Sequence, residues 1–367
     1  MYPSLLAVFP LLLSAFAHKE ATTPEEKEIQ RSLRNAAYHC APAVGDFTAA
    51  RKRAFAQKAL GQAGQPYLPG YDELFAQEVV QGIDGPDRDF LSCSPVQDTQ
   101  IENNTCVLTP EVTEGPYYHK VGHPIRQNIA EYQDGLLLVR RLLTGVSCSL
   151  IPGKLLDIGV IDVETCKPAP NVLVDIWLAN ATGHYSGHPE PAPHLADEQP
   201  QVGGKRSGLL SAFPRTQHHE TFLRGAWQTD RNGVAQFTSI FPGYYTGRAT
   251  HIHTKVFPEW TVHPENGTFT PGRLAHVGQF FFEDDINMSV DKMFPYTENP
   301  IRHTRGRTRN WRDSLNIFED SHINGYNPVF KTHLLGGVVS QGVIAYITMG
   351  VNMSASYDNW WKGGSDS

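Results

Sequence analysis

The sequence of 367 residues lacks the features that membrane, nucleic-acid-binding and repeat proteins need. Beyond residues 1–17, no apolar stretch reaches the length of about 20 residues that spans a bilayer. The net charge of −7 and the pI near 6.1 come without long blocks of one sign, which argues against nucleic acid or a membrane surface as partner. Neither an internal repeat nor a low-complexity tract occurs. Small molecules are therefore the favoured ligands.

Cysteine is also scarce, with five residues in the whole chain. In an oxidising compartment, five cysteines predict two disulfides and one leftover thiol. Five choices of the unpaired residue and three pairings of the other four leave fifteen arrangements open. So few disulfides add stability to a fold that has its own hydrophobic core, and they do not make the chain a disulfide-rich scaffold. They are Cys40, Cys93, Cys106, Cys148 and Cys166.

The first 17 residues, MYPSLLAVFPLLLSAFA, predict a signal peptide. They form a short apolar run that ends in Ala15-Phe16-Ala17, the small-x-small pattern of a cleavage site, so the mature chain is expected to begin at His18. Four sequons agree with secretion, at Asn103, Asn266, Asn287 and Asn352. We therefore expect a secreted, extracellular glycoprotein.

The remaining chain is expected to divide into a helical segment, a linker, a β domain and a tail. Residues 18–61 are predicted to be helical, since Thr23, Pro24 and Glu26 form an N-terminal capping pattern. Residues 62–110 mix Pro, Gly and Asp without a clear period and are interpreted as an irregular linker. The β domain is expected over 111–355 and the C-terminal tail over 356–367.

Short β-branched runs separated by turns predict a mainly β domain, built as a β-sandwich or barrel. The runs lie within residues 154–163, 171–179, 224–229, 233–240, 251–257, 276–283 and 342–351. Asp230-Arg231-Asn232-Gly233 predicts a hairpin turn between two of them. The Pro-, Gly- and His-rich loop 186–208 is long enough to suggest function or mobility.

Metal chemistry is indicated by the stretch FPGYYTGRATHIHTKVF, residues 241–257. In a strand, His251 and His253 share one face about 7 Å apart at Cα, which lets both imidazoles reach one ion. Two half-exposed histidines on a wet face are the alternative. The tyrosines just ahead favour a metal, because a phenol titrates near pH ~10 and ionises at neutral pH only beside a strongly Lewis-acidic cation. Phenolate and imidazole suit ferric iron better than zinc or copper(I).

Several motifs together resemble the intradiol ring-cleavage dioxygenases, the catechol and protocatechuate dioxygenase family. They are W-x-A-N-x-x-G-x-Y at 177–185, P-G-x-Y at 242–245, R-x-x-H-I-H at 248–253, TEGPYY at 113–118 and GQFFF at 278–282. The resemblance covers roughly residues 110–350. It implies a β-sandwich that holds non-haem Fe(III) and opens catechols with O₂ between the two hydroxylated carbons, giving muconate-type diacids.

The resemblance also implies roles for particular residues. The iron ligands are Tyr185, Tyr245, His251 and His253, with Tyr245 rather than Tyr244 matching the second tyrosine of the pattern. Arg248 is expected to stabilise negative charge on the bound diol, with Gln279 beside it. Tyr245 is expected to leave the metal when substrate binds and so to take part in catalysis. Tyr117 and Tyr118 match the entrance of the substrate pocket.

Other interpretations remain open at this stage. An N-terminal His18 can chelate copper in a secreted oxidative enzyme, and a β-sandwich can be a binding module without catalysis. His218 and His219 beside Glu220 are interpreted as a solvated loop rather than a second metal cluster. His184 and His276 are possible pocket neighbours. Asn180 opens a fifth sequon but lies five residues before Tyr185, and we expect it to be unmodified. The oligomeric state stays open.

Overall fold

The computed structural model describes residues 156–188, 219–304, 306–318, 321, 327–334 and 339–357, with parts of 23–51 and of 112–138. The expected signal peptide, His18, the region 62–110, residues 189–208 of the long loop and the tail beyond 357 lie outside the described residues. Cys93, Cys106, Cys148, Asn103 and His218 lie outside them as well.

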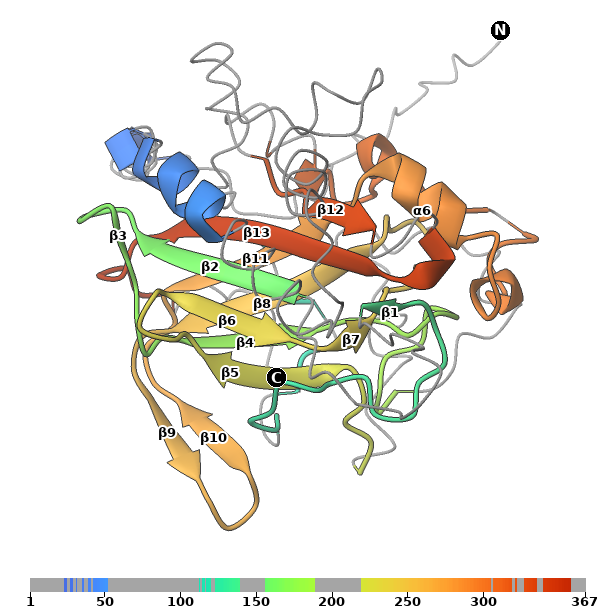
Figure 1. Cartoon of the computed structure of the whole chain (residues 1–367), viewed down its shortest axis with the longest axis horizontal. Coiled ribbons are helices and arrows are strands. Elements are labelled where there is room, and N and C mark those ends of the chain that lie inside the picture. Colours follow the sequence, from blue (N-terminus) through green and yellow to red (C-terminus); the bar gives the residue numbers. More distant parts are fainter. Residues whose placement is uncertain are drawn as a thin grey trace, which may run out of the picture.

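Two β-sheets pack face to face and confirm the expected mainly β sandwich (Figure 1). The first sheet has the order β11 (His276–Phe281), β8 (His251–Phe257), β4 (Leu173–Trp177) and β5 (Arg224–Gln228). The second has the order β12 (Lys331–Leu334), β13 (Val343–Val351), β2 (Leu156–Asp162) and β3 (Lys167–Pro168), and β6 (Val234–Phe237) also pairs with β2. Neighbouring strands are antiparallel except β13 and β2, which run parallel.

The core lies between the sheets and is made by alternate residues of each strand. Ile158 and Ile347 from the second sheet join Ile176, Ile252 and Phe280 from the first in one buried cluster. Burial of this apolar surface is the main force that holds the sheets together. Because every second residue of β8 is used in this way, its other residues face away from the core and are free to build something else.

Smaller elements surround the sandwich. β1 (Leu137–Leu138) pairs with β7 (Ser239–Ile240), and β9 (Trp260–His263) pairs with β10 (Thr268–Pro271) in a hairpin that projects from the body (Figure 1). Helix α6 (Asp284–Val290) and the 3₁₀ turns η2 (Tyr296–Glu298), η3 (Asn310–Arg312) and η4 (Val339–Gln341) follow the first sheet along the chain or lie between later strands. None of the described helices is long and apolar enough to cross a bilayer.

The turn at Asp230–Gly233 is present but does not make the expected hairpin. The amide N–H of Gly233 donates to the carbonyl of Asp230 over 2.8 Å, as a tight turn requires. The flanking strands then separate, because β5 pairs with β4 in one sheet whereas β6 pairs with β2 in the other. The turn therefore carries the chain across the sandwich, and the hairpin prediction is wrong.

The expected N-terminal helical segment is present over residues 42–51, and it covers the outer face of the second sheet (Figure 1). Arg51 contacts the carboxylate of Asp157 on β2, and its guanidinium donates to the Thr348 hydroxyl on β13 over 2.9 Å. Gly159 of β2 allows this close approach, because a Cβ there would overlap Arg51. A disulfide joins Cys40 to Cys166. This segment thus packs on its own sandwich.

Candidate metal centre

The outer face of the first sheet carries the candidate site. His251 and His253 alternate with the core residue Ile252 on β8, so both histidines point away from the sheet interface. The strand register sets Trp177 of β4 and Gln279 of β11 directly opposite His253, one on each side. A single row of side chains therefore crosses three strands at this end of the sheet.

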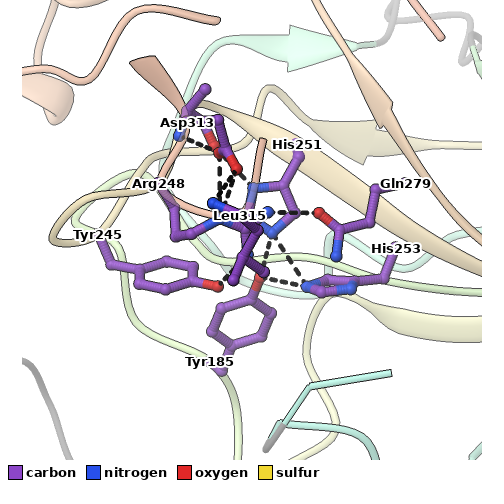
Figure 2. A network of polar contacts seen from close by, with 9 residues as sticks. Tyr185, Tyr245, Arg248, His251, His253, Gln279, Asp313 and Leu315 are labelled. Carbon is purple, nitrogen blue, oxygen red and sulfur yellow. Dashed lines mark hydrogen bonds and ion pairs between the residues drawn. The ribbon is translucent and has the colours of Figure 1, made fainter. Parts of the chain in front are cut away.

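A loop after β4 delivers Tyr185 to the two histidines. The Asn180 carboxamide oxygen accepts from the amides of Thr182 and His184, over 3.1 and 3.0 Å, and Gly183 turns the chain with a positive φ of 87°. The phenol oxygen of Tyr185 lies 3.1 Å from His253 Nε2 and 3.5 Å from His251 Nε2. The two Nε2 atoms are 3.0 Å apart (Figure 2).

These separations are those of ligands around one ion. Two donors that share an ion through bonds of about 2.1 Å lie roughly 3.0 to 3.6 Å apart. The tautomer of His251 also fits, because its Nδ1–H donates to the Ala249 carbonyl over 2.7 Å and leaves the Nε2 lone pair facing Tyr185. The three atoms can therefore serve as one facial set of metal ligands.

Tyr245 reaches the same place from the loop after β7. Its phenol oxygen accepts from Arg248 Nη1 over 3.1 Å, and its ring lies 5.7 Å, between centroids, from the rings of both Tyr185 and His251. Tyr244 points elsewhere: its ring lies 4.2 Å from the Arg307 guanidinium and packs against Ile301. Tyr245 rather than Tyr244 therefore belongs to the cluster.

Arg248 is held by a residue that the sequence did not indicate. Its Nε donates to the two carboxylate oxygens of Asp313 over 3.1 and 3.0 Å, and its Nη2 donates to Gln279 Oε1 (Figure 2). Asp313 lies 65 residues downstream of Arg248, just after η3, in a segment without a strand pattern or motif. Only the folded chain brings the two together.

Burial decides the charges of these groups. It lowers the pKa of His251 well below its usual value, helped by Arg248, and it lowers the pKa of His253 likewise, helped by His251 and Arg248. Burial raises the pKa of Tyr185 and of Tyr245, although Arg248 opposes the rise in both. Neutral imidazoles are the ligand form. The phenols, in contrast, need a strongly charged cation among them before they ionise.

Aromatic rings enclose the cluster. Tyr117 stacks on Tyr185 with centroids 4.4 Å apart and an interplanar angle of 6°, and Trp177 stacks on His253 at 4.7 Å and 8°. Tyr118 packs against Trp177, with its hydroxyl 3.2 Å from the carboxylate of Asp175. Of the two tyrosines expected at the pocket entrance, Tyr117 thus contacts Tyr185 directly and Tyr118 lies one layer away.

His184, His219 and His276, the other histidines named from sequence that the structure describes, do not join the cluster. The Nε2 of His184 lies 2.6 Å from the His188 carbonyl, and His276 lies on the face of β11 opposite to Gln279 by strand alternation. His219 is exposed, and the carboxylate of Glu220 accepts from the Gly187 amide over 2.9 Å. Within the described ranges, no three residues drawn from His, Cys, Asp and Glu are placed to hold a metal ion.

A β-sandwich with a buried centre of two histidines and two tyrosines defines a class of candidate metalloprotein, and comparison with known proteins narrows that class. No family model matches the sequence. The chain is 28% identical over 184 residues to the protocatechuate 3,4-dioxygenase beta chain of Burkholderia cepacia. This alignment covers 48% of this chain and 60% of the Burkholderia chain. The match thus spans less than two thirds of the curated relative.

Solved structures of similar proteins carry related names. An intradiol ring-cleavage dioxygenase from Tetranychus urticae is 26% identical, with a TM-score of 0.48, and the match covers 69% of this chain and 98% of that chain. Catechol 1,2-dioxygenase from Pseudomonas arvilla C-1 is 13% identical, with a TM-score of 0.34 and coverage of 82% and 90%. The sequence similarity to the curated relative makes this chain an intradiol dioxygenase-like protein.

Proposed function

We propose that this protein is a secreted, non-haem Fe(III) dioxygenase that opens catechol-type rings between their two hydroxylated carbons. The observation that carries the proposal is the convergence of the Tyr185 hydroxyl and the Nε2 atoms of His251 and His253 within 3.5 Å of one another. Tyr245 completes the ligand set. Neutral imidazoles and hard phenolate oxygens favour ferric iron over softer ions.

The proposed reaction combines a catechol with one molecule of O₂. The carbon–carbon bond between the hydroxylated carbons breaks, both oxygen atoms of O₂ enter the product, and the ring becomes a muconate-type diacid. Bound ferric iron supplies the Lewis acidity that makes the ring reactive toward O₂. Two phenolates offset most of the charge of the ion, which lowers the cost of keeping it buried.

The remaining polar groups are arranged for a substrate that becomes anionic. Arg248 supplies fixed positive charge beside Tyr245, and Gln279 presents a buried Nε2 that has no hydrogen-bond partner in the described part of the chain. Such preorganised donors stabilise developing negative charge most effectively where water is excluded. Tyr117, half-buried over both ligand tyrosines, is the residue that we expect to border the substrate ring, with Tyr118 behind it.

Secretion remains part of the proposal. The Cys40–Cys166 disulfide supports it, because disulfides persist mainly in oxidising compartments. The apolar residues 1–17 agree with it as a signal peptide.

The decisive experiment incubates purified, iron-loaded protein with a panel of catechols under ¹⁸O₂ and identifies products by mass spectrometry. Ring-opened diacids that carry two ¹⁸O atoms support the proposal. Tyrosinate-to-Fe(III) charge transfer should also give a reddish protein. Colourless iron-replete protein, or a metal analysis that finds copper, contradicts the ligand assignment. Catechol binding without any diacid favours a binding module instead.

A further inference from the structure

We propose that Asp313 is the positioning residue of this site and couples Arg248 to the metal ligand His251. The inference rests on the proposed function, since it assigns Asp313 a task in that reaction. The side chains of Asp313 and Arg248 are almost completely buried, with exposed fractions of 0% and 6%. A buried carboxylate that has a guanidinium partner needs its remaining lone pairs satisfied as well.

Asp313 meets that requirement with backbone amides. Its Oδ2 accepts from the Ala249 amide over 2.8 Å, and its Oδ1 accepts from the Leu315 amide over 3.1 Å. Together with the two contacts to Arg248 Nε, these bonds fix the carboxylate in one orientation. The carboxylate in turn fixes the backbone at residues 248–249.

That short piece of backbone controls the orientation of His251. The Ala249 amide is bound to Asp313, while the Ala249 carbonyl accepts from His251 Nδ1. The hydrogen bond to Nδ1 sets both the ring orientation and the tautomer, and hence where the Nε2 lone pair points. Asp313 therefore acts on His251 through a single residue, Ala249, whose amide and carbonyl lie in two consecutive peptide units.

The same carboxylate selects which edge of the guanidinium faces the site. With Nε bound to Asp313, the two terminal nitrogens of Arg248 are directed to the Tyr245 hydroxyl and to Gln279 Oε1. Guanidinium groups are planar, so fixing one edge also fixes the direction of the other donors. Loss of the carboxylate would let the positive charge swing away from Tyr245.

The segment that carries Asp313 is itself held by hydrogen bonds on both sides of this residue. Asn310 donates its side-chain amide to the Phe282 carbonyl over 2.7 Å, and the Ser314 amide donates to the Gly247 carbonyl over 2.9 Å. The segment thus bridges the end of β11 and the loop before β8. This anchoring makes Asp313 part of a rigid support rather than of a freely moving loop.

The test compares Asp313→Asn with Asp157→Asn, since each removes the charge from a buried aspartate that has an arginine partner. Asp157 also accepts from Gln236 Nε2 over 2.7 Å and lies on the second sheet, away from the site. In metal-free protein, Asp313→Asn should speed hydrogen exchange in peptides covering 245–253, whereas Asp157→Asn should not. In iron-loaded protein, Asp313→Asn should shift the visible band and lower kcat by about 100-fold, with a smaller change in KM.

Three further variants keep the test decisive. Asp313→Glu retains the charge but lengthens the side chain, and it should also lower kcat while keeping iron. The double variant Arg248→Lys/Asp313→Asn should have a kcat only slightly lower than that of Arg248→Lys alone, because the two residues act together. Wild-type exchange and spectrum in Asp313→Asn, or equal losses in Asp313→Asn and Asp157→Asn, would overturn the inference. If the wild-type protein opens no catechol, the proposed function fails, and the exchange measurement still decides the role of Asp313.

Discussion

Tyr185 and Tyr245 carry the same functional group but are held in different ways. Tyr185 is 3% exposed, follows a buried strand and lies within 3.5 Å of both imidazole nitrogens. Tyr245 is half-buried, belongs to a loop that includes Gly243 and Gly247, and is held by Arg248. In the proposed site, the first is therefore expected to be a fixed ligand, and the second, in a glycine-flanked loop, is expected to move.

This difference predicts unequal effects of removing each hydroxyl. Tyr185→Phe should weaken iron binding by at least about 100-fold and abolish most of the colour, since it removes the oxygen shared between both histidines. Tyr245→Phe should keep iron and bind catechols, but turn over about 100-fold more slowly, because a proton acceptor is lost. Iron content, visible spectra and single-turnover rates will compare the variants. The reverse pattern would mean that the two roles are exchanged.

The burial of His123 leads us to predict that the free energy of unfolding depends on pH. Burial lowers its pKa, and this effect outweighs the opposing influence of Asp175, whose carboxylate lies 2.7 Å from His123 Nδ1. The imidazole stays neutral in the folded protein under conditions where an unfolded histidine, with a pKa near 6.5, already takes up a proton. Stability is therefore present above about pH 6.5 and is lost as the pH falls, by about 1.4 kcal/mol per pH unit from this group.

Urea unfolding of the metal-free protein between pH 5 and 7.5 measures this effect. His123→Gln should be less stable than wild type at pH 7.5, because the bond to Asp175 is altered, but should lose less further stability on acidification. Equal slopes for the two proteins would assign the acid sensitivity to other groups.

Residue patterns revealed part of the site and could not reveal the rest. The spacing of His251 and His253 indicates a shared face because strand geometry is regular. The tyrosines and Arg248 followed from motifs of consecutive residues. Asp313 has no such signal, since its partner lies 65 positions away and depends on how a segment without strand pattern folds back.

At the scale of elements, two loops bring Tyr185 and Tyr245 of the candidate metal centre together by approaching each other closely. Gly183 lies in the loop of Tyr185 and Gly243 in the loop of Tyr245, and the Gly243 amide donates to the Asn180 carbonyl over 3.1 Å. A Cβ at Gly243 would overlap the carbonyl oxygens of Asn180 and Ala181, which are backbone atoms that cannot turn aside. The two loops can therefore touch only where glycine is present.

Gly243→Ala should push these loops apart. We expect a loss of about 2 kcal/mol of folding stability and a fall of about 10- to 100-fold in iron affinity, since the two tyrosines no longer meet. Gly45→Ala in the N-terminal helical segment is the matched control, because a Cβ there meets nothing within 4 Å. Chelator competition and urea unfolding will measure both. Unchanged iron affinity in Gly243→Ala would show that the contact is not needed.

The surroundings of the sequons predict which of them can be glycosylated. Asn266 is exposed in the turn between β9 and β10, whereas Asn287 is 1% exposed in α6 and donates its amide to the Phe282 carbonyl over 3.1 Å. Asn180 donates to Gln133 Oε1 over 3.0 Å. After passage through a eukaryotic secretory pathway, peptide mapping should find a glycan at Asn266 and none at Asn287 or Asn180. A glycan at Asn180 would mean that the Tyr185 loop faces solvent.

Strands were easier to predict than their partners. The β-branched runs indicated β2, β4, β8, β11 and β13 because alternating burial leaves a period in the sequence. The turn at Asp230–Gly233 has hairpin residues, yet it joins strands of different sheets. Local turn chemistry fixes the bend of the chain, whereas burial of the flanking side chains chooses the sheet.

At the scale of the whole molecule, the outer faces of the two sheets serve different purposes. One outer face carries the candidate metal centre, and the other is covered by residues 42–51 through the Arg51–Asp157 contact. The Cys40–Cys166 disulfide, which spans 126 residues, secures that cover. The N-terminal segment therefore contributes stability at a distance from the chemistry.

Replacing both Cys40 and Cys166 by serine should lower the free energy of unfolding by about 2 to 5 kcal/mol, because the unfolded chain regains the freedom that the bond removes. Iron content and turnover of the folded protein should stay at wild-type levels. Urea unfolding and metal analysis give the two quantities. A loss of iron in this double variant would show that the outer faces are coupled.

The parallel pairing of β13 with β2 has a consequence for how the protein is made. β2 ends at Asp162, but its parallel neighbour β13 begins only at Val343. The two histidines and two tyrosines of the candidate centre, together with Asp313, leave the ribosome earlier, while the sheet that backs them still lacks a strand. A nascent chain therefore exposes imidazoles and phenols without a finished sandwich behind them. In the proposed iron site, lasting capture of the ion would therefore follow translation, as a late step of maturation.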